Sequence, residues 1–164
     1  MRLYLIRHGQ PNNETIDPQK GLSPVGQQEI ELLASILQAN NISVKEIWHS
    51  DKTRAVQTAS ILSTGIKMQN GLLEKKGLGP TDRPEPIVGQ IFAAGADLLI
   101  VTHMPLVSKL ASLLLTGDDF RLPLNFDAGA MACLNFTEGH WHLEWFAYPR
   151  LFKRGDLLDL RSYH

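Results

Sequence analysis

The stretch Asp97-Leu98-Leu99-Ile100-Val101-Thr102-His103 decides the fold that we expect for this chain. A short, continuous apolar run with polar residues at its ends is typical of a strand that is buried on both faces of a sheet. Pro105 then opens an apolar segment, 106–115, and Gly117 follows it, which is the pattern of a helix. This strand-to-helix step predicts one unit of an α/β domain with a parallel sheet.

Strands and helices alternate outward from this unit through most of the chain. Further strands are expected at 1–6, 44–50, 66–73, 130–136 and 141–147. Further helices are expected from Ser23-Pro24 to Asn40-Asn41, over 51–62 with Asp51 as a cap, and over 86–94. Loops rich in Pro and Gly occupy 9–22 and 75–86. The pattern predicts a single domain, residues 1–164, built as a three-layer α/β/α sandwich on a mainly parallel mixed sheet, with no element assigned beyond about residue 150.

Composition narrows the classes of partner. Of the 164 residues, 43% are apolar and 20% are charged, and the formal net charge is −1, so we expect neither a nucleic acid nor a membrane as partner. Cys133 is the single cysteine, so no internal disulfide can form, which fits a reducing compartment. No stretch approaches the roughly 18 apolar residues of a membrane helix, and the run 1–6 is too short for a signal peptide. We expect a cytoplasmic monomer.

Polar residues with useful chemistry follow three of the expected strands. Arg7-His8-Gly9 ends the first strand, the segment 50–54 joins the second strand to a helix, and Thr102-His103 ends the strand quoted above. Each motif alone is weak evidence, because a histidine after a strand is more often a hydrogen-bonded structural residue. Together they gain weight, because the carboxyl ends of parallel strands lie at one edge of a sheet, where ligands bind.

That edge would hold two imidazoles, of His8 and His103, and two guanidiniums, of Arg7 and Arg54. Guanidinium forks suit phosphate oxygens. Arg54 and His103 also lie in or just before the first turn of an expected helix, where free N–H groups favour an anion. Burying these four groups without an anion would require carboxylate partners, and none is close to His8 in sequence. The pattern predicts a phosphate site, and without a metal-ligand spacing we expect no metal and no other cofactor.

These motifs resemble those of the histidine phosphatase superfamily, which has the phosphoglycerate mutase-like fold. Arg7-His8-Gly9 resembles its R-H-G, residues 50–59 resemble its S-P-x-x-R-A-x-Q-T-A segment, and Val101-Thr102-His103 resembles its later strand that ends in histidine. The resemblance covers about residues 1–150. The short length and the segments 78–82 and 103–107 are most similar to the SixA-type phosphohistidine phosphatases. Larger mutases carry a long helical insertion before the second histidine, and residues 75–102 leave little room for one.

The resemblance implies a role for each residue of the cluster. His8 would attack phosphorus and carry a transient phosphohistidine, while Arg7, Arg54 and His103 would hold the phosphoryl oxygens and stabilise the transition state. The chemistry agrees, because a neutral imidazole is a good nucleophile and the phosphoramidate that it forms is labile to water. Gly9 would let the backbone turn tightly beside the phosphate.

Two positions depart from the superfamily pattern. Asp51 replaces the proline after Ser50, and its charge would oppose phosphate unless it caps the helix, as we expect. The usual general acid is a glutamate just after the third strand. Glu74 is a candidate, but alignment on Leu78-Gly79-Pro80 would place Gly77 there, and we expect Glu74 to be a solvated loop residue. A missing acid favours phosphohistidine substrates, because an imidazole leaving group needs less acid help than an alkoxide.

Three functions follow from this pattern. The leading one is a phosphatase that acts on phosphohistidine in a signalling protein, with a histidine phosphotransfer domain as partner. An alternative is a small-molecule phosphomonoesterase for a phosphorylated metabolite, which would need a working acid such as Glu74. Another alternative is a non-catalytic phosphate-binding module, although a pure binder would have no need of a nucleophile such as His8. The missing insertion predicts an open site.

Overall fold

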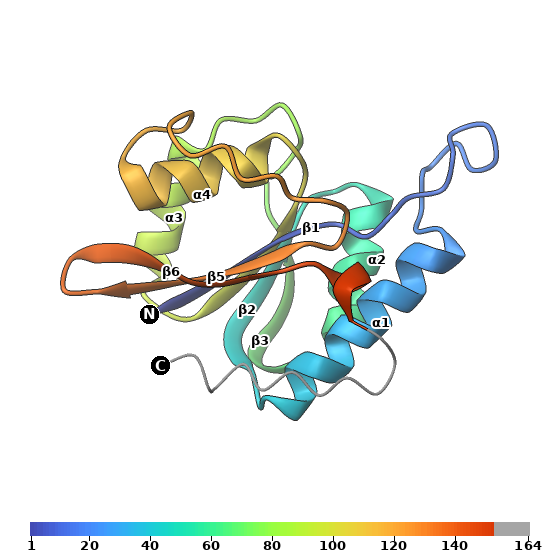
Figure 1. Ribbon diagram of the computed structural model, residues 1–164, viewed down its shortest axis with the longest axis horizontal. Coiled ribbons are helices and arrows are strands. Elements are labelled where there is room, and N and C mark those ends of the chain that lie inside the picture. Colours follow the sequence, from blue (N-terminus) through green and yellow to red (C-terminus); the bar gives the residue numbers. More distant parts are fainter. Residues whose placement is uncertain (153–164) are drawn as a thin grey trace.

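The computed structural model describes residues 1–152, which form one six-stranded sheet with helices on both faces (Figure 1). The strands are β1 (Arg2–Arg7), β2 (Ser43–His49), β3 (Lys67–Glu74), β4 (Leu98–Thr102), β5 (Met131–Thr137) and β6 (His140–Ala147). The helices are α1 (Pro24–Ala39), α2 (Thr53–Leu62), α3 (Glu85–Ala94) and α4 (Leu106–Thr116), followed by a 3-10 turn at Pro149–Leu151. Every predicted helix and strand is present within a few residues, so the predicted α/β/α fold is confirmed.

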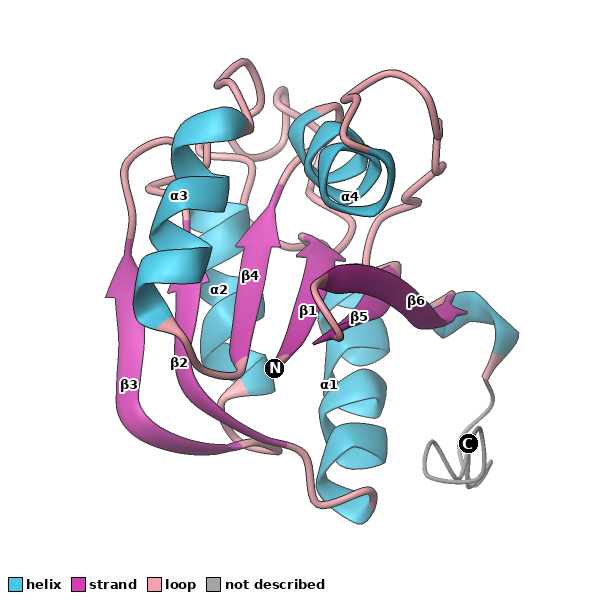
Figure 2. Ribbon diagram, turned by 90° about the vertical axis from the view of Figure 1, so that its left-hand side faces the viewer, coloured by secondary structure: helices cyan, strands magenta, loops and turns pink. Residues whose placement is uncertain are grey.

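The strand order is β3-β2-β4-β1-β5-β6. Strands β3, β2, β4 and β1 are parallel to one another, and β5 and β6 extend the sheet beyond β1 as antiparallel strands. All residues of β4 are buried, as the run that opened the sequence analysis predicts for an interior strand. The carboxyl ends of the four parallel strands lie at the same edge of the sheet, at the top of Figure 2.

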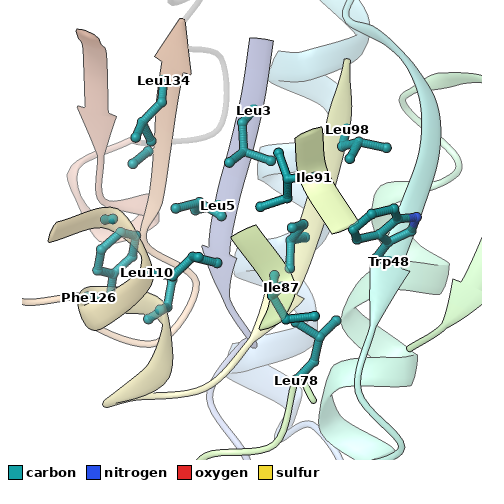
Figure 3. Packing of buried hydrophobic residues seen from close by; sticks show 14 of the residues in the cluster. Leu3, Leu5, Trp48, Leu78, Ile87, Ile91, Leu98, Leu110, Phe126 and Leu134 are labelled. Carbon is teal, nitrogen blue, oxygen red and sulfur yellow. The ribbon is translucent and has the colours of Figure 1, made fainter. Parts of the chain in front are cut away.

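Each face of the sheet has its own apolar core, because successive side chains of a strand point to opposite faces. Tyr4 and Ile6 of β1 pack with apolar residues of α1 and α2. Leu3 and Leu5 pack with residues of α3 and α4 in the second cluster, which also holds Trp48 (Figure 3). The two cores fix the sheet between its helices and thereby hold the strand ends in place.

The start of α2 differs from the prediction that Asp51 caps this helix. The N-cap residue is Lys52, whose side chain makes no cap hydrogen bond. The backbone N–H of Lys52 donates instead to Ser50 Oγ, at 3.4 Å. The Asp51 carboxylate is 63% exposed and pairs with the Lys52 ammonium at 3.4 Å. The expectation for Asp51 is therefore wrong, because its carboxylate extends into solvent toward Lys52 and does not bond the free N–H groups of the first turn of α2.

The connection from β3 to β4 contains α3 as its only helix, so this part of the chain has no long helical insertion. The unassigned tail beyond about residue 150 lies mostly outside the described residues, and the single domain over 1–164 stays a prediction. No helix within residues 1–152 is long and apolar enough to cross a membrane. The cytoplasmic location stays a prediction as well.

Candidate active site

The four site residues predicted from the sequence lie in or next to one small cluster at the carboxyl ends of the parallel strands. They are Arg7, His8, Arg54 and His103. Arg7 is the last residue of β1 and pairs in register with Thr102, the last residue of β4. His8 and His103 therefore follow neighbouring strand ends, and their ring centroids are 4.9 Å apart. Arg54, in the first turn of α2, donates a hydrogen bond from Nε to His8 Nε2 at 3.2 Å. Parallel pairing of β1 with β4 thus brings together residues 95 positions apart in sequence.

The protonation of His8 is fixed by its neighbours. Its Nδ1 lies 2.7 Å from the carbonyl oxygen of Gly9, and a carbonyl can only accept, so Nδ1 carries the proton. Nε2 accepts from Arg54 and is therefore the nitrogen with the free electron pair. Desolvation lowers the pKa of His8 to about 3, although the Gly9 carbonyl opposes this, and the charges of His103, Arg54 and Arg7 lower it further. His8 is thus a neutral imidazole at pH 7, only 4% exposed, with Nε2 as its nucleophilic atom.

His103 is a second neutral imidazole beside it. The side chain is 1% exposed, and its Nε2 lies 2.6 Å from Ser50 Oγ. Burial is the main cause that lowers the pKa of His103 to about 4, and the cations of Arg54 and Lys52 add to it. Two imidazoles next to two guanidiniums would be strongly cationic if they were protonated, so the site keeps its positive charge on the arginines.

The two arginines supply that charge. Arg7 donates from Nη1 to the carbonyl oxygen of Phe126 at 2.9 Å, which holds the guanidinium in place. Desolvation lowers the pKa of Arg7 and of Arg54, and Asp127 partly offsets this for Arg7. Among the described residues, Arg7 Nε is a buried atom without a hydrogen-bond partner. Buried donors are normally paired, so this donor-rich cluster suits an anion with several acceptor oxygens, such as a phosphoryl group.

Thr58 joins the two halves of the site, a role that the sequence motifs did not predict. Its Oγ1 donates to the Arg54 carbonyl oxygen at 2.7 Å and accepts from the Gly9 N–H at 3.0 Å. The first turn of α2 is thereby tied to the backbone that follows His8. The spacing of four residues from Arg54, on the same helix face, is the signal that could have found it.

Gly9 is required by close packing. Its φ is not in the left-handed region, unlike that of six other glycines within residues 1–152. A Cβ at this position would lie 2.8 Å from Ile30 Cγ1 and 3.1 Å from Leu22 Cδ2, both side-chain atoms. The predicted tight turn is therefore better described as a close approach of the backbone to α1 and its preceding loop.

Glu74 does not join the cluster. The strand register aligns Glu74 with His49, Val101 and Ile6, so three strand spacings, roughly 14 Å, separate its backbone from β1. The side chain is exposed and lines a pocket of about 440 Å³ formed by residues 50–52 and 74–82. The charges that act on His8 come from His103, Arg54 and Arg7, and none of these is a carboxylate.

The loop after β3 places other residues closer to the cluster. Thr102 donates from Oγ1 to the Leu78 carbonyl oxygen at 2.7 Å, which holds Leu78 at the end of β4, directly before His103. The preceding residue, Gly77, has a positive φ of 87° and no side chain. The carboxylate of this loop, on Asp82, accepts from the Gly79 N–H at 2.7 Å. The alignment of Gly77 at the place of the usual acid stays a prediction.

Comparison with known families agrees with this geometry. Residues 3–76 match the family model of the histidine phosphatase superfamily (branch 1). The mitochondrial serine/threonine-protein phosphatase PGAM5 of Rattus norvegicus is 36% identical over 62 residues, which are 37% of this chain and 22% of that protein. Human PGAM5 is 30% identical over 91 residues, 52% of this chain and 30% of that protein. The chain thus matches less than a third of the length of these curated relatives.

Solved structures share the fold over nearly the whole chain. The protein histidine phosphatase SixA, complexed with tungstate, superimposes with a TM-score of 0.82 at 24% identity and covers 93% of this chain and 100% of its own. The α-ribazole phosphatase of Shigella flexneri reaches 0.68 at 16% identity, over 91% and 97% of the two chains. A mycobacterial glucosyl-3-phosphoglycerate phosphatase reaches 0.66 at 17%, over 87% and 96%. These likenesses establish the fold, and the resemblance expected from the sequence is confirmed.

Proposed function

We propose that this protein is a phosphatase that works through a phosphohistidine on His8. Its sequence motifs and its fold are those of the histidine phosphatase superfamily. The observation that carries the proposal is the pair of contacts that the two ring nitrogens of His8 make. Nδ1–H donates to the Gly9 carbonyl, so Nε2 presents a free electron pair beside Arg54. Neutral imidazole in this state needs no base to remove a proton before it attacks phosphorus.

The reaction has two steps. In the first, His8 Nε2 forms a bond to phosphorus while the bond from phosphorus to the leaving group breaks, and the leaving group keeps that electron pair. Arg7, Arg54 and His103 bind the phosphoryl oxygens, whose charge shifts in the transition state. In the second step, water attacks the same phosphorus, the P–N bond breaks, and its electron pair returns to Nε2. Both hydrogens of the water stay on the phosphate, which leaves as dihydrogen phosphate, and His8 is again neutral with its proton on Nδ1.

We propose phosphohistidine in a protein as the substrate. Among residues 1–152, no carboxylate is one of the charges that shift the pKa of His8, which favours a leaving group that departs without strong acid help. Protonated imidazole is such a leaving group, whereas an alkoxide is not. The similarity in fold to the protein histidine phosphatase SixA supports the same choice. A phosphorylated histidine phosphotransfer domain is then the partner.

A phosphorylated metabolite is the second candidate. Other proteins of this fold are named for small phosphorylated molecules, among them α-ribazole and glucosyl-3-phosphoglycerate. Glu74 would have to act as the acid here, reaching the leaving group across the pocket that it lines together with Ser50.

The substrate is tested by comparing kcat/KM for a phosphohistidine protein and for an alkyl phosphate ester. We expect a clear preference for phosphohistidine. His8→Asn is the matched control, because an asparagine amide can still donate to the Gly9 carbonyl but offers no nucleophile, and it should abolish both activities. A preference for the alkyl ester would refute the proposed substrate, and full activity of His8→Asn would refute the proposed mechanism.

A further inference from the structure

We infer that Ser50 is a positioning residue that holds His103 as the tautomer with its proton on Nδ1, so that this N–H is the group His103 offers to the substrate. The acceptor on the substrate is a phosphoryl oxygen, and this part of the inference rests on the proposed function. The position of the proton rests on the contacts of Ser50 alone.

Sheet topology places Ser50 against His103. Ser50 directly follows β2, and β2 pairs with β4 so that His49 lies opposite Val101. The next residues along both strands therefore meet at the same edge. Ser50 Oγ lies 2.6 Å from His103 Nε2, and both side chains are only 1% exposed. A contact this short between buried groups is a hydrogen bond, and its proton belongs to one of the two atoms.

The second contact of Ser50 decides which atom donates. The backbone N–H of Lys52 donates to Ser50 Oγ at 3.4 Å. If Oγ also accepted from His103 Nε2–H, the buried hydroxyl hydrogen would have no acceptor among the described residues, which is costly. If the hydroxyl donates to Nε2, both contacts of Ser50 Oγ are satisfied, and the donor without a partner among the described residues is the N–H on Nδ1 of His103, which a substrate oxygen would accept. Nε2 is then the unprotonated nitrogen, and the neutral ring carries its single proton on Nδ1.

The other nitrogen of the ring supports this assignment. His103 Nδ1 is buried and has no hydrogen-bond partner among residues 1–152. The ring that carries it lies 4.9 Å from the ring of His8. An Nδ1–H in this place can donate to a phosphoryl oxygen that approaches His8. The opposite tautomer would turn a lone pair toward the same anionic oxygen and repel it.

The effect on catalysis follows from this geometry. Without the Ser50 hydroxyl, the His103 ring can change its tautomer and its orientation. Only part of the protein molecules then present the Nδ1–H donor to the substrate. The donor matters most where charge moves onto the phosphoryl oxygens in the transition state, so kcat should fall more than KM rises. Removal of the partner that orients a metal-ligating histidine typically costs about 10–100-fold in activity, and we expect a loss of the same order for His103.

The test is nitrogen NMR of the full chain with ¹⁵N-labelled histidine at neutral pH, without substrate. His103→Gln identifies the signals of His103 by their loss. We expect native protein to show a protonated Nδ1 and an unprotonated Nε2. Ser50→Ala should give signals averaged between the two tautomers, and Ser50→Thr, which keeps a hydroxyl, should restore the native pattern. Ser112→Ala is the control, because Ser112 is equally buried and donates to the Asp118 carbonyl, and it should leave the His103 signals unchanged.

The outcomes separate this inference from the proposed function. A native proton on Nε2, or unchanged nitrogen signals in Ser50→Ala, would overturn the role of Ser50 even if the enzyme is fully active. A proton on Nδ1 that depends on Ser50, in a protein without phosphatase activity, would support the positioning role and overturn the proposed function. With both correct, Ser50→Ala lowers kcat on the phosphohistidine protein about 10–100-fold, and Ser50→Thr recovers it.

Discussion

Acidification should destabilise the folded protein through its two buried active-site imidazoles. The pKa of His8 is about 3 and that of His103 is about 4 in the folded state, against about 6.5 in an unfolded chain. The unfolded chain therefore binds more protons below about pH 6.5, so this part of the stability is present at neutral pH and is lost as the pH falls toward 4. When the pH falls from 7 to 5, proton uptake by each of these histidines in the unfolded chain should lower the free energy of unfolding by about 2 kcal/mol.

Urea unfolding at pH 7, 6 and 5 measures this loss. The native protein should lose about 4 kcal/mol from both histidines together. His8→Asn and His103→Gln should each remove about half of that pH dependence, because each replaces one titrating ring with a neutral amide. Asparagine matches the Nδ1 position that bonds Gly9, and glutamine can reach the Nε2 position that bonds Ser50. A pH dependence that is identical in the native protein and both variants would refute the conclusion that these rings are buried and neutral.

Three further substitutions test other parts of the site. Arg54→Lys should lower kcat/KM about 10²–10³-fold, because an ammonium cannot supply both the bond to His8 and a fork to phosphate; an equally active lysine variant would contradict this. Thr58→Val should lower the unfolding free energy by about 1–3 kcal/mol in urea titrations, because the Gly9 N–H loses its acceptor; a neutral effect would show that the link is dispensable. Glu74→Gln should leave turnover of a phosphohistidine protein nearly unchanged, whereas a drop of about 10²–10⁴-fold on alkyl esters would identify Glu74 as the acid of a metabolite phosphatase.

The elements that the sequence predicted well are those with strong apolar periodicity. The apolar run 98–101 and the helix signals of Ser23-Pro24 and Gly117 match β4, the start of α1 and the end of α4. The cluster of His8 and His103 could be predicted because it needs only parallel strands and polar residues at their ends. Neither inference depends on the precise placement of a side chain.

Details that depend on such placement could not be predicted. The Asp51 side chain points into solvent and pairs with Lys52 instead of capping α2, and a residue preference for the cap position does not show this. The carbonyl oxygen of Phe126 holds Arg7, but a backbone group leaves no trace in residue identity. The proton positions on His8 likewise follow from distances and not from sequence.

The most direct test of the central claim is to trap the intermediate. Native protein mixed with a ³²P-labelled phosphohistidine protein and quenched in alkali within milliseconds should carry label on His8, and the adduct should be stable to base and labile to acid. Because Nδ1–H is held by the Gly9 carbonyl, the phosphoryl group should be on Nε2. His8→Asn should carry no label under the same conditions. Label on a serine, on His8 Nδ1, or equally on the His8→Asn protein would contradict the account.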